Sequence, residues 1–172
     1  MLSLVKALKL AESLGESRAK TYKKYLQIVD FPAGKKALQF LAEAENSHLQ
    51  FLKKQSQRLN KGEKVLYLKL HQPEIIFPLA EDSSKKSVGN LTSDIGIFRI
   101  VSDFERYDVQ FYKYAYAQSK SPDSRQLFKN MSKIEEKHLE LINKTVKLAE
   151  NSQKALMHED PRILFYKMTK RK

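Results

Sequence analysis

The chain of 172 residues contains no cysteine. It therefore cannot form a disulfide, a thiolate zinc site, a cysteine-ligated iron–sulfur cluster or a cysteine nucleophile of its own. Glycine and proline are scarce, at five each, which favours long uninterrupted helices over a β fold with many turns. No apolar run approaches the roughly 18 residues of a membrane span. We therefore expect a soluble, cytoplasmic protein that is mainly helical.

Basic residues outnumber acidic residues by 32 to 20, which gives a formal net charge of +12. Such a charge would suit binding to nucleic acid, anionic lipid or an acidic protein. The lysines, however, are scattered in pairs along the chain and do not form one stripe interleaved with aromatic residues. No nucleic-acid-binding motif occurs. We interpret the charge as a solvated surface and expect neither nucleic acid nor a membrane as a partner.

Helical periodicity of apolar residues dominates the chain. It predicts helices over about residues 3–29, 34–60, 92–120 and 122–153. Residues 30–34 break the first helix, and the third should begin near Thr92 or Ser93, which are good N-cap residues. Prolines and a Gly-Asn pair in residues 61–92 argue against one continuous helix there and indicate a long crossover packed on the bundle. Residues 154–172 are expected to form a basic tail or a short terminal helix.

Short turns should make two antiparallel helical hairpins, one from each half of the chain. The long crossover then allows the hairpins to join with the second and third helices parallel. That topology is the ferritin-like version of the four-helix bundle. We therefore predict an all-α fold, with the bundle over residues 1–153 and the crossover at 61–92.

Two Glu-x-x-His motifs stand in the second and fourth helices and use two of the four histidines. They are Glu45 with His48 and Glu135 with His138. Residues three apart share one face of a helix, and both pairs lie in the apolar stripe of their helix. Because burying ionisable groups is costly unless they are paired or bind a metal, the motifs predict metal ligands.

The other two helices supply further glutamates. Glu16 precedes Glu45 by 29 residues and Glu105 precedes Glu135 by 30, so the chain contains an approximate internal duplication. A pseudo-twofold axis would bring four carboxylates and two imidazoles to one level of the core, where two divalent ions would neutralise the four negative charges. Such oxygen-rich ligation suits iron or manganese better than zinc. Glu12, one turn before Glu16, is the alternative ligand if the register of the first helix differs.

These segments resemble the ferritin-like di-iron carboxylate superfamily, and within it the rubrerythrin-like group. The resemblance rests on residues 15–19, 42–49 and 134–138, and on Glu105 with Phe111 and Tyr112. The chain lacks the cysteine-ligated rubredoxin site of rubrerythrins, so the resemblance implies an external electron-donor protein. It implies two iron ions, or manganese, on Glu16, Glu45, His48, Glu105, Glu135 and His138, with Tyr22, Asp108 and Tyr112 as supporting residues beside the ligands.

The function that the resemblance implies is a non-haem di-iron oxidoreductase that reduces peroxide or dioxygen. Related proteins often form dimers, and we expect a homodimer. Two alternatives stay open. One is a ferroxidase that handles iron, for which storage would require a large hollow assembly. The other is a metal-free helical interaction module that uses its basic surface. For the tyrosines, an ordinary place in the core is the alternative to a role at the site.

Overall fold

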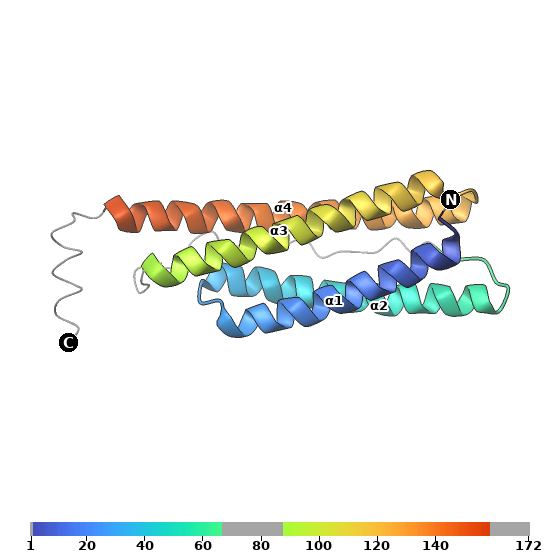
Figure 1. Cartoon of the computed structure of the whole chain (residues 1–172), viewed down its shortest axis with the longest axis horizontal. Coiled ribbons are helices and arrows are strands. Elements are labelled where there is room, and N and C mark those ends of the chain that lie inside the picture. The colour runs from blue at the N-terminus through green and yellow to red at the C-terminus, as the bar shows by residue number, and fades with distance from the viewer. Residues whose placement is uncertain (1, 67–87, 159–172) are drawn as a thin grey trace.

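A computed structural model of the chain describes residues 2–66 and 88–158, which form four helices. They are α1 (Leu4–Ile28), α2 (Pro32–Asn60), α3 (Val88–Gln118) and α4 (Pro122–His158). Helices α1 and α2 pack as one hairpin and α3 and α4 as another, and the hairpins meet through α2 with α4 and α1 with α3. The predicted all-α four-helix bundle is thereby confirmed (Figure 1). None of the described helices is both long and apolar enough to cross a membrane.

The direction of the helices also agrees with the predicted topology. Figure 1 shows α2 and α3 running the same way, and α2 ends at the end of the bundle opposite to the start of α3. Most of the expected crossover, residues 67–87, and the tail from residue 159 onward lie outside the described residues.

Capping side chains and prolines explain where three of the helices begin. The Ser3 hydroxyl accepts a hydrogen bond from the backbone N–H of Lys6 at the start of α1, and Pro32 opens α2. At the start of α4, Ser121 Oγ accepts from the backbone N–H of Ser124 at 3.1 Å, beside a proline whose missing N–H costs nothing at that position. Helix α4 then continues to His158, five residues beyond the predicted end at 153.

Helix α3 begins at Val88, earlier than the predicted start near Thr92. Thr92, one of the two residues expected to cap it, contacts another helix instead. Thr92 Oγ1 accepts a hydrogen bond from a side chain of α4 at 2.6 Å. Asp94 Oδ2 accepts from the backbone N–H groups of Asp30 and Phe31 at 3.0 and 2.7 Å. The prediction was wrong here because tertiary hydrogen bonds took the place of the local cap.

Two apolar clusters fill the bundle on either side of a buried polar layer. One contains Leu38, Leu41, Phe98, Val101 and Ile142. The other contains Leu8, Leu52, Phe128, Met131 and Ile134. Each helix contributes to the layer between them, which consists of Arg18, Glu45, His48, Glu105, Asp108, Glu135 and His138.

Helices α2 and α3 approach each other closely at Gly34. A Cβ atom at this position would lie 2.6 and 2.9 Å from two ring carbons of Phe98. Such distances are too short for carbon atoms in contact, whose optimum separation is about 3.5–4.0 Å. Gly34 is therefore needed for Phe98 to fill the core between the two hairpins.

Candidate metal centre

The imidazole of His138 faces three carboxylates from three helices. Its Nδ1 atom lies 2.9 Å from Glu135 Oε2, 3.5 Å from Glu45 Oε1 and 3.6 Å from Glu105 Oε2. The ring of Phe40 closes the other side of the imidazole edge-on, with a centroid distance of 5.9 Å. His138 and Glu105 are fully buried, so the charges meet in a region from which water is excluded.

The second imidazole shares two of these carboxylates. His48 Nδ1 lies 3.4 Å from Glu135 Oε1 and 3.7 Å from Glu45 Oε1. The rings of His48 and His138 stack with their centroids 5.3 Å apart and an angle of 14° between their planes. Glu45 and Glu135 therefore each lie within reach of both imidazoles.

The chemistry of this cluster fits a metal ion. One ligand atom each from Glu45, His48, Glu135 and His138 can be chosen so that all four lie within 4.8 Å of one another. Glu45 Oε1, His48 Nδ1 and Glu105 Oε2 are buried and have no hydrogen-bond partner among the described residues. Buried polar atoms without a partner are rare in folded proteins and call for an explanation. Carboxylate oxygens and imidazole nitrogens are common ligands of divalent metal ions in proteins.

Burial and mutual repulsion displace the pKa values of the cluster. Burial alone would lower the pKa of His48, but the carboxylates of Glu135 and Glu45 outweigh it and raise that pKa to about 9. The same competition raises the pKa of His138 well above its ordinary value. Burial raises the pKa of Glu105 to about 7. Burial would also raise the pKa of Glu135, but the two imidazoles hold it well below its usual range. Without a metal, protons on the imidazoles supply the positive charge that the carboxylates require.

The structure places the predicted supporting residues around Glu105. Tyr22 donates a hydrogen bond from its hydroxyl to Glu105 Oε1 at 2.6 Å. Asp108, one turn along α3, accepts two hydrogen bonds from Arg18, at 2.8 and 3.1 Å. Tyr112 is buried one turn further on, and the carboxylates of the cluster add to the effect of burial in raising its pKa.

Glu16, the expected ligand from the first helix, does not reach the cluster. Its side chain is 52% exposed and forms an ion pair with Lys20 at 2.7 Å. The expectation that the Glu16 side chain joins the other carboxylates in the core is therefore wrong. The alternative, Glu12, is only partly buried and accepts a hydrogen bond from Ser56. Helix α1 turns Gly15 and Arg18 toward the centre of the bundle instead.

The spacing of the glutamates in the sequence could have shown that Glu16 is not the counterpart of Glu105. The two motifs are offset by 90 residues, since 135 − 45 = 90 and 138 − 48 = 90. The same offset carries Glu105 onto position 15, because 105 − 90 = 15, and that residue is Gly15. Glu16 had to be shifted by one residue to fit the duplication. One residue is about 100° around a helix, enough to move a side chain from the core to the surface.

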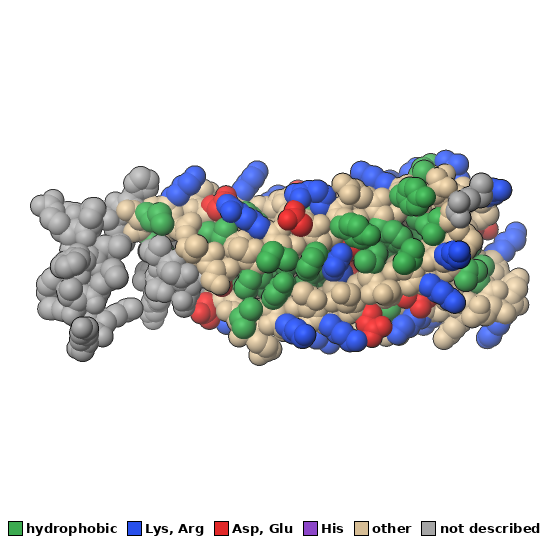
Figure 2. Space-filling model, viewed as in Figure 1, with side chains coloured by type: hydrophobic (Ala, Val, Ile, Leu, Met, Phe, Trp, Pro, Cys, Tyr) green, Lys and Arg blue, Asp and Glu red, His purple; other side chains and the backbone are tan. Residues whose placement is uncertain are grey.

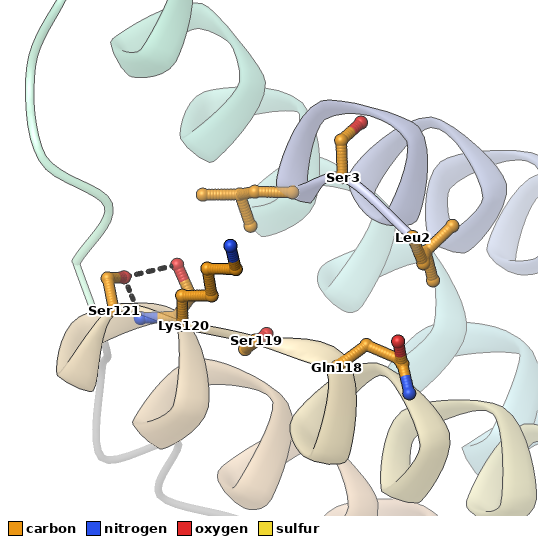
Figure 3. A pocket seen from close by; sticks show the side chains of 8 residues that line it. Leu2, Ser3, Gln118, Ser119, Lys120 and Ser121 are labelled. Carbon is orange, nitrogen blue, oxygen red and sulfur yellow. Dashed lines mark hydrogen bonds between the residues drawn. The ribbon is translucent and has the colours of Figure 1, made fainter.

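A cleft of about 400 Å³ lies elsewhere, where the start of α1 meets the turn between α3 and α4 (Figure 3). Its lining consists of Leu2, Ser3, Leu4, Gln118, Ser119, Lys120, Ser121 and Ser124. Figure 3 shows Ser121 hydrogen-bonded within the cleft, where it caps α4. This lining includes no carboxylate and no imidazole. The buried carboxylate and imidazole cluster is therefore separate from this cleft.

Comparison with known proteins supports the fold. No family model matches the chain, and no curated protein matches it. A solved structure of a hypothetical protein from Pyrococcus furiosus resembles it with a TM-score of 0.65 and 22% sequence identity. The likeness covers 87% of this chain and 91% of that one. At this level of identity the likeness shows a shared fold.

The class of site follows from the bundle and the cluster together. Four helices carry two Glu-x-x-His pairs that meet in a buried layer, with a third carboxylate beside them. This arrangement fits a ferritin-like di-iron site, in which carboxylates and histidines project inward from the helices of a four-helix bundle.

Proposed function

We propose that this protein is a non-haem di-iron oxidoreductase that reduces peroxide or dioxygen with electrons from an external donor protein. The observation that carries the proposal is the sharing of Glu45 and Glu135 between two imidazoles. Carboxylates that each face two histidines suit a pair of ions roughly 3.5–4 Å apart, as in other two-metal sites. One atom each of Glu45, His48, Glu135 and His138 also lies within reach of a single ion, so the number of ions per chain distinguishes a one-metal from a two-metal site.

The proposed ligands are Glu45, His48, Glu105, Glu135 and His138. Ligation by oxygen with some imidazole suits iron or manganese, and iron is favoured because the proposed reaction requires a change of oxidation state. Two bound ferrous ions would supply the two electrons that, with two protons taken up from solution, convert hydrogen peroxide to two molecules of water.

The residues around the ligands serve such a site by orienting them and by excluding water. The Tyr22 hydroxyl fixes one oxygen of Glu105 and leaves the other facing His138. The two apolar clusters lie on either side of the layer and keep it dry. Electrostatic interactions are stronger in such a region than in water, so the proposed metal ions would be held firmly.

Metal content tests the proposal directly. Protein purified without chelator is expected to carry about two iron or manganese ions per chain by mass spectrometry, as a two-metal site requires. The Glu45→Ala/Glu135→Ala double variant should lose them. Glu16→Ala is the matched control, because it removes a glutamate that the structure places on the surface, and it should retain the metal. Absence of metal from the parent protein, even after anaerobic loading with Fe(II), would refute the proposal.

The reaction is tested on the loaded protein. Addition of hydrogen peroxide to the anaerobic Fe(II) form should oxidise both ions faster than dioxygen or buffer alone does.

We propose a homodimer of about 40 kDa, from 2 × 20.0 kDa. Light scattering measures this mass, and a hollow assembly of many chains would favour iron storage in place of peroxide reduction.

The distribution of basic side chains on the surface does not favour nucleic acid as a partner. On the face of the molecule drawn in Figure 2, Lys and Arg side chains are spread along the bundle, with apolar and acidic groups between them. A nucleic-acid interface usually gathers its positive charge on one patch or stripe. The distribution on this face supports a solvated surface.

A further inference from the structure

The 90-residue offset relates five pairs of residues in and beside the buried layer, and the two residues of a pair differ in two cases. Glu45 and His48 repeat as Glu135 and His138 after 90 residues, and Tyr22 repeats as Tyr112, since 112 − 22 = 90. Arg18 and Asp108 also stand 90 residues apart and bind each other. The fifth pair is Gly15 and Glu105. One hairpin therefore supplies a carboxylate to the cluster where the other supplies only a hydrogen atom.

Gly15 lies against the cluster in the place that the duplication assigns to a carboxylate. It is buried, and a Cβ atom on it would lie 3.7 Å from Glu45 Oε2 and 3.7 Å from Leu49 Cβ. These are ordinary contact distances, so a side chain could begin there. Glu105, its counterpart, faces His138 with Oε2 at 3.6 Å. Neither Glu12 nor Glu16 fills the corresponding place beside His48, because each forms its contact elsewhere.

Because Gly15 supplies no carboxylate, the cluster has one negative charge fewer than a site with four carboxylates. As metal ligands, Glu45, Glu105 and Glu135 would carry three negative charges, while Arg18 and Asp108 pair with each other. Two divalent ions would leave the site with 4 − 3 = 1 positive charge. A buried charge without a counter-charge is costly. A fourth negative charge beside Gly15 would balance it.

We propose that Gly15 leaves a metal position beside His48 open to a small monoanion from solution, such as azide, formate or the anion of a peroxide. The inference rests on the proposed metal site and specifies where an external ligand enters it. The anion supplies the charge that Glu105 supplies on the other side. Its size is limited by the contacts of Gly15 with Glu45 and Leu49.

Azide is the probe, and the Co(II)-loaded protein is the sample, because anion binding to Co(II) changes its visible absorption. We expect the parent protein to bind one azide per chain. Gly15→Ala, which adds only a methyl group at contact distance, should bind azide similarly. Gly15→Glu should supply the carboxylate from the chain itself and weaken azide binding by about tenfold or more, with an unchanged number of metal ions by mass spectrometry. Gly15→Asp, with a shorter side chain, replaces Gly15→Glu if the latter does not fold.

The outcomes separate this inference from the proposed function. A parent protein that holds metal but shows no azide-dependent change overturns the inference alone. Azide binding that is as tight in the Gly15→Glu or Gly15→Asp variant as in the parent also overturns it. Failure of every variant to bind metal overturns the proposed function and the inference together.

Discussion

At the scale of single residues, the ion pair of Arg18 and Asp108 joins the two hairpins beside the proposed metal ligands. The side chains are 10% and 5% exposed, and the guanidinium also lies over the ring of Phe104, 4.2 Å from its centroid. The pair brings opposite charges from α1 and α3 together across the axis of the duplication. A buried pair of this kind holds its two partners mainly because either one alone would be a buried charge without a counter-ion.

Removing one partner of this pair should therefore destabilise the protein strongly. We expect Asp108→Ala to lower the free energy of unfolding by about 3–5 kcal/mol. Urea denaturation of metal-free protein measures the change. Glu136→Ala is the control, because its ion pair with Lys113 is exposed and should contribute at most about 1 kcal/mol. Equal effects of the two substitutions would contradict the prediction, whereas an apolar Arg18→Met/Asp108→Leu double variant should recover much of the loss.

The hydrogen bond from Tyr22 to Glu105 gives a second prediction at this scale. Tyr22→Phe removes the donor and leaves a buried carboxylate oxygen without its partner, at an expected cost of about 1–3 kcal/mol. Tyr112→Phe is the matched control from the other hairpin, where Gly15 stands in place of a carboxylate. Denaturation of both variants in the presence of chelator should show the larger loss for Tyr22→Phe. A larger loss for Tyr112→Phe would count against the proposed asymmetry.

At the scale of the helices, the close approach of α2 and α3 depends on Gly34 and Phe98. The Phe98 ring is fully buried and packs near Phe31 at the start of α2, with a centroid distance of 6.3 Å. The backbone of α2 must lie against the ring for the core to be filled. This contact, together with the hydrogen bonds of Asp94, joins the first turn of α2 to the second hairpin.

A pair of glycine substitutions tests this contact. Gly34→Ala places a methyl group against the Phe98 ring, so we expect a loss of about 1–3 kcal/mol from overpacking. Gly96→Ala is the control in α3, because a Cβ there would meet no described atom within 4 Å. It should stabilise the protein by up to about 1 kcal/mol through helix propensity alone. Thermal unfolding distinguishes the two, and a stabilising Gly34→Ala would show that the ring moves aside freely.

At the scale of the whole molecule, the polar layer links metal binding to folding. The layer divides the core into two apolar clusters, and its carboxylates and imidazoles face one another at 2.9–3.7 Å. Metal ions or protons must balance its charge. Because metal binding requires neutral imidazoles, the stability of the loaded and metal-free forms should respond to pH differently.

Metal-free protein should lose stability as the pH rises. The pKa of His48 is raised to about 9 in the folded protein, against about 6.5 in an unfolded chain. The stabilisation by its proton is therefore complete below about pH 6.5 and lost as the pH rises to about 9. The raised pKa of Glu105, about 7, acts in the same direction at lower pH, because the folded state binds that proton more tightly.

Thermal unfolding with chelator should thus show a melting temperature that falls by several degrees between pH 6 and pH 9. Protein loaded with metal should not show this fall, because ions replace the protons. His48→Ala removes one of the two imidazoles whose pKa is raised and should reduce the dependence in the metal-free form. A melting temperature of the parent that rises over the same range would contradict the assignment of the shifted pKa values.

Much of this architecture was predictable from local pattern. Helical periodicity located all four helices, and the apolar surroundings of the two Glu-x-x-His motifs indicated that they face the core. Glu45, His48, Glu135 and His138 do lie together there. These inferences succeed because a helix repeats every 3.6 residues, so the sequence alone states which residues share a face. The boundaries were less predictable, since α3 begins at Val88 and not near Thr92.

Only the tertiary structure decided which residue α1 presents to the cluster. Glu12, Gly15 and Glu16 lie within about one turn of α1, and a rotation of about 100° exchanges one for the next. The rotation is set by contacts from outside the helix, above all the ion pair of Arg18 with Asp108 and the hydrogen bond from Tyr22 to Glu105. The periodicity of the sequence thus determined the bundle and the two motifs. Packing between the hairpins determined that the first hairpin contributes a glycine where the second contributes a glutamate.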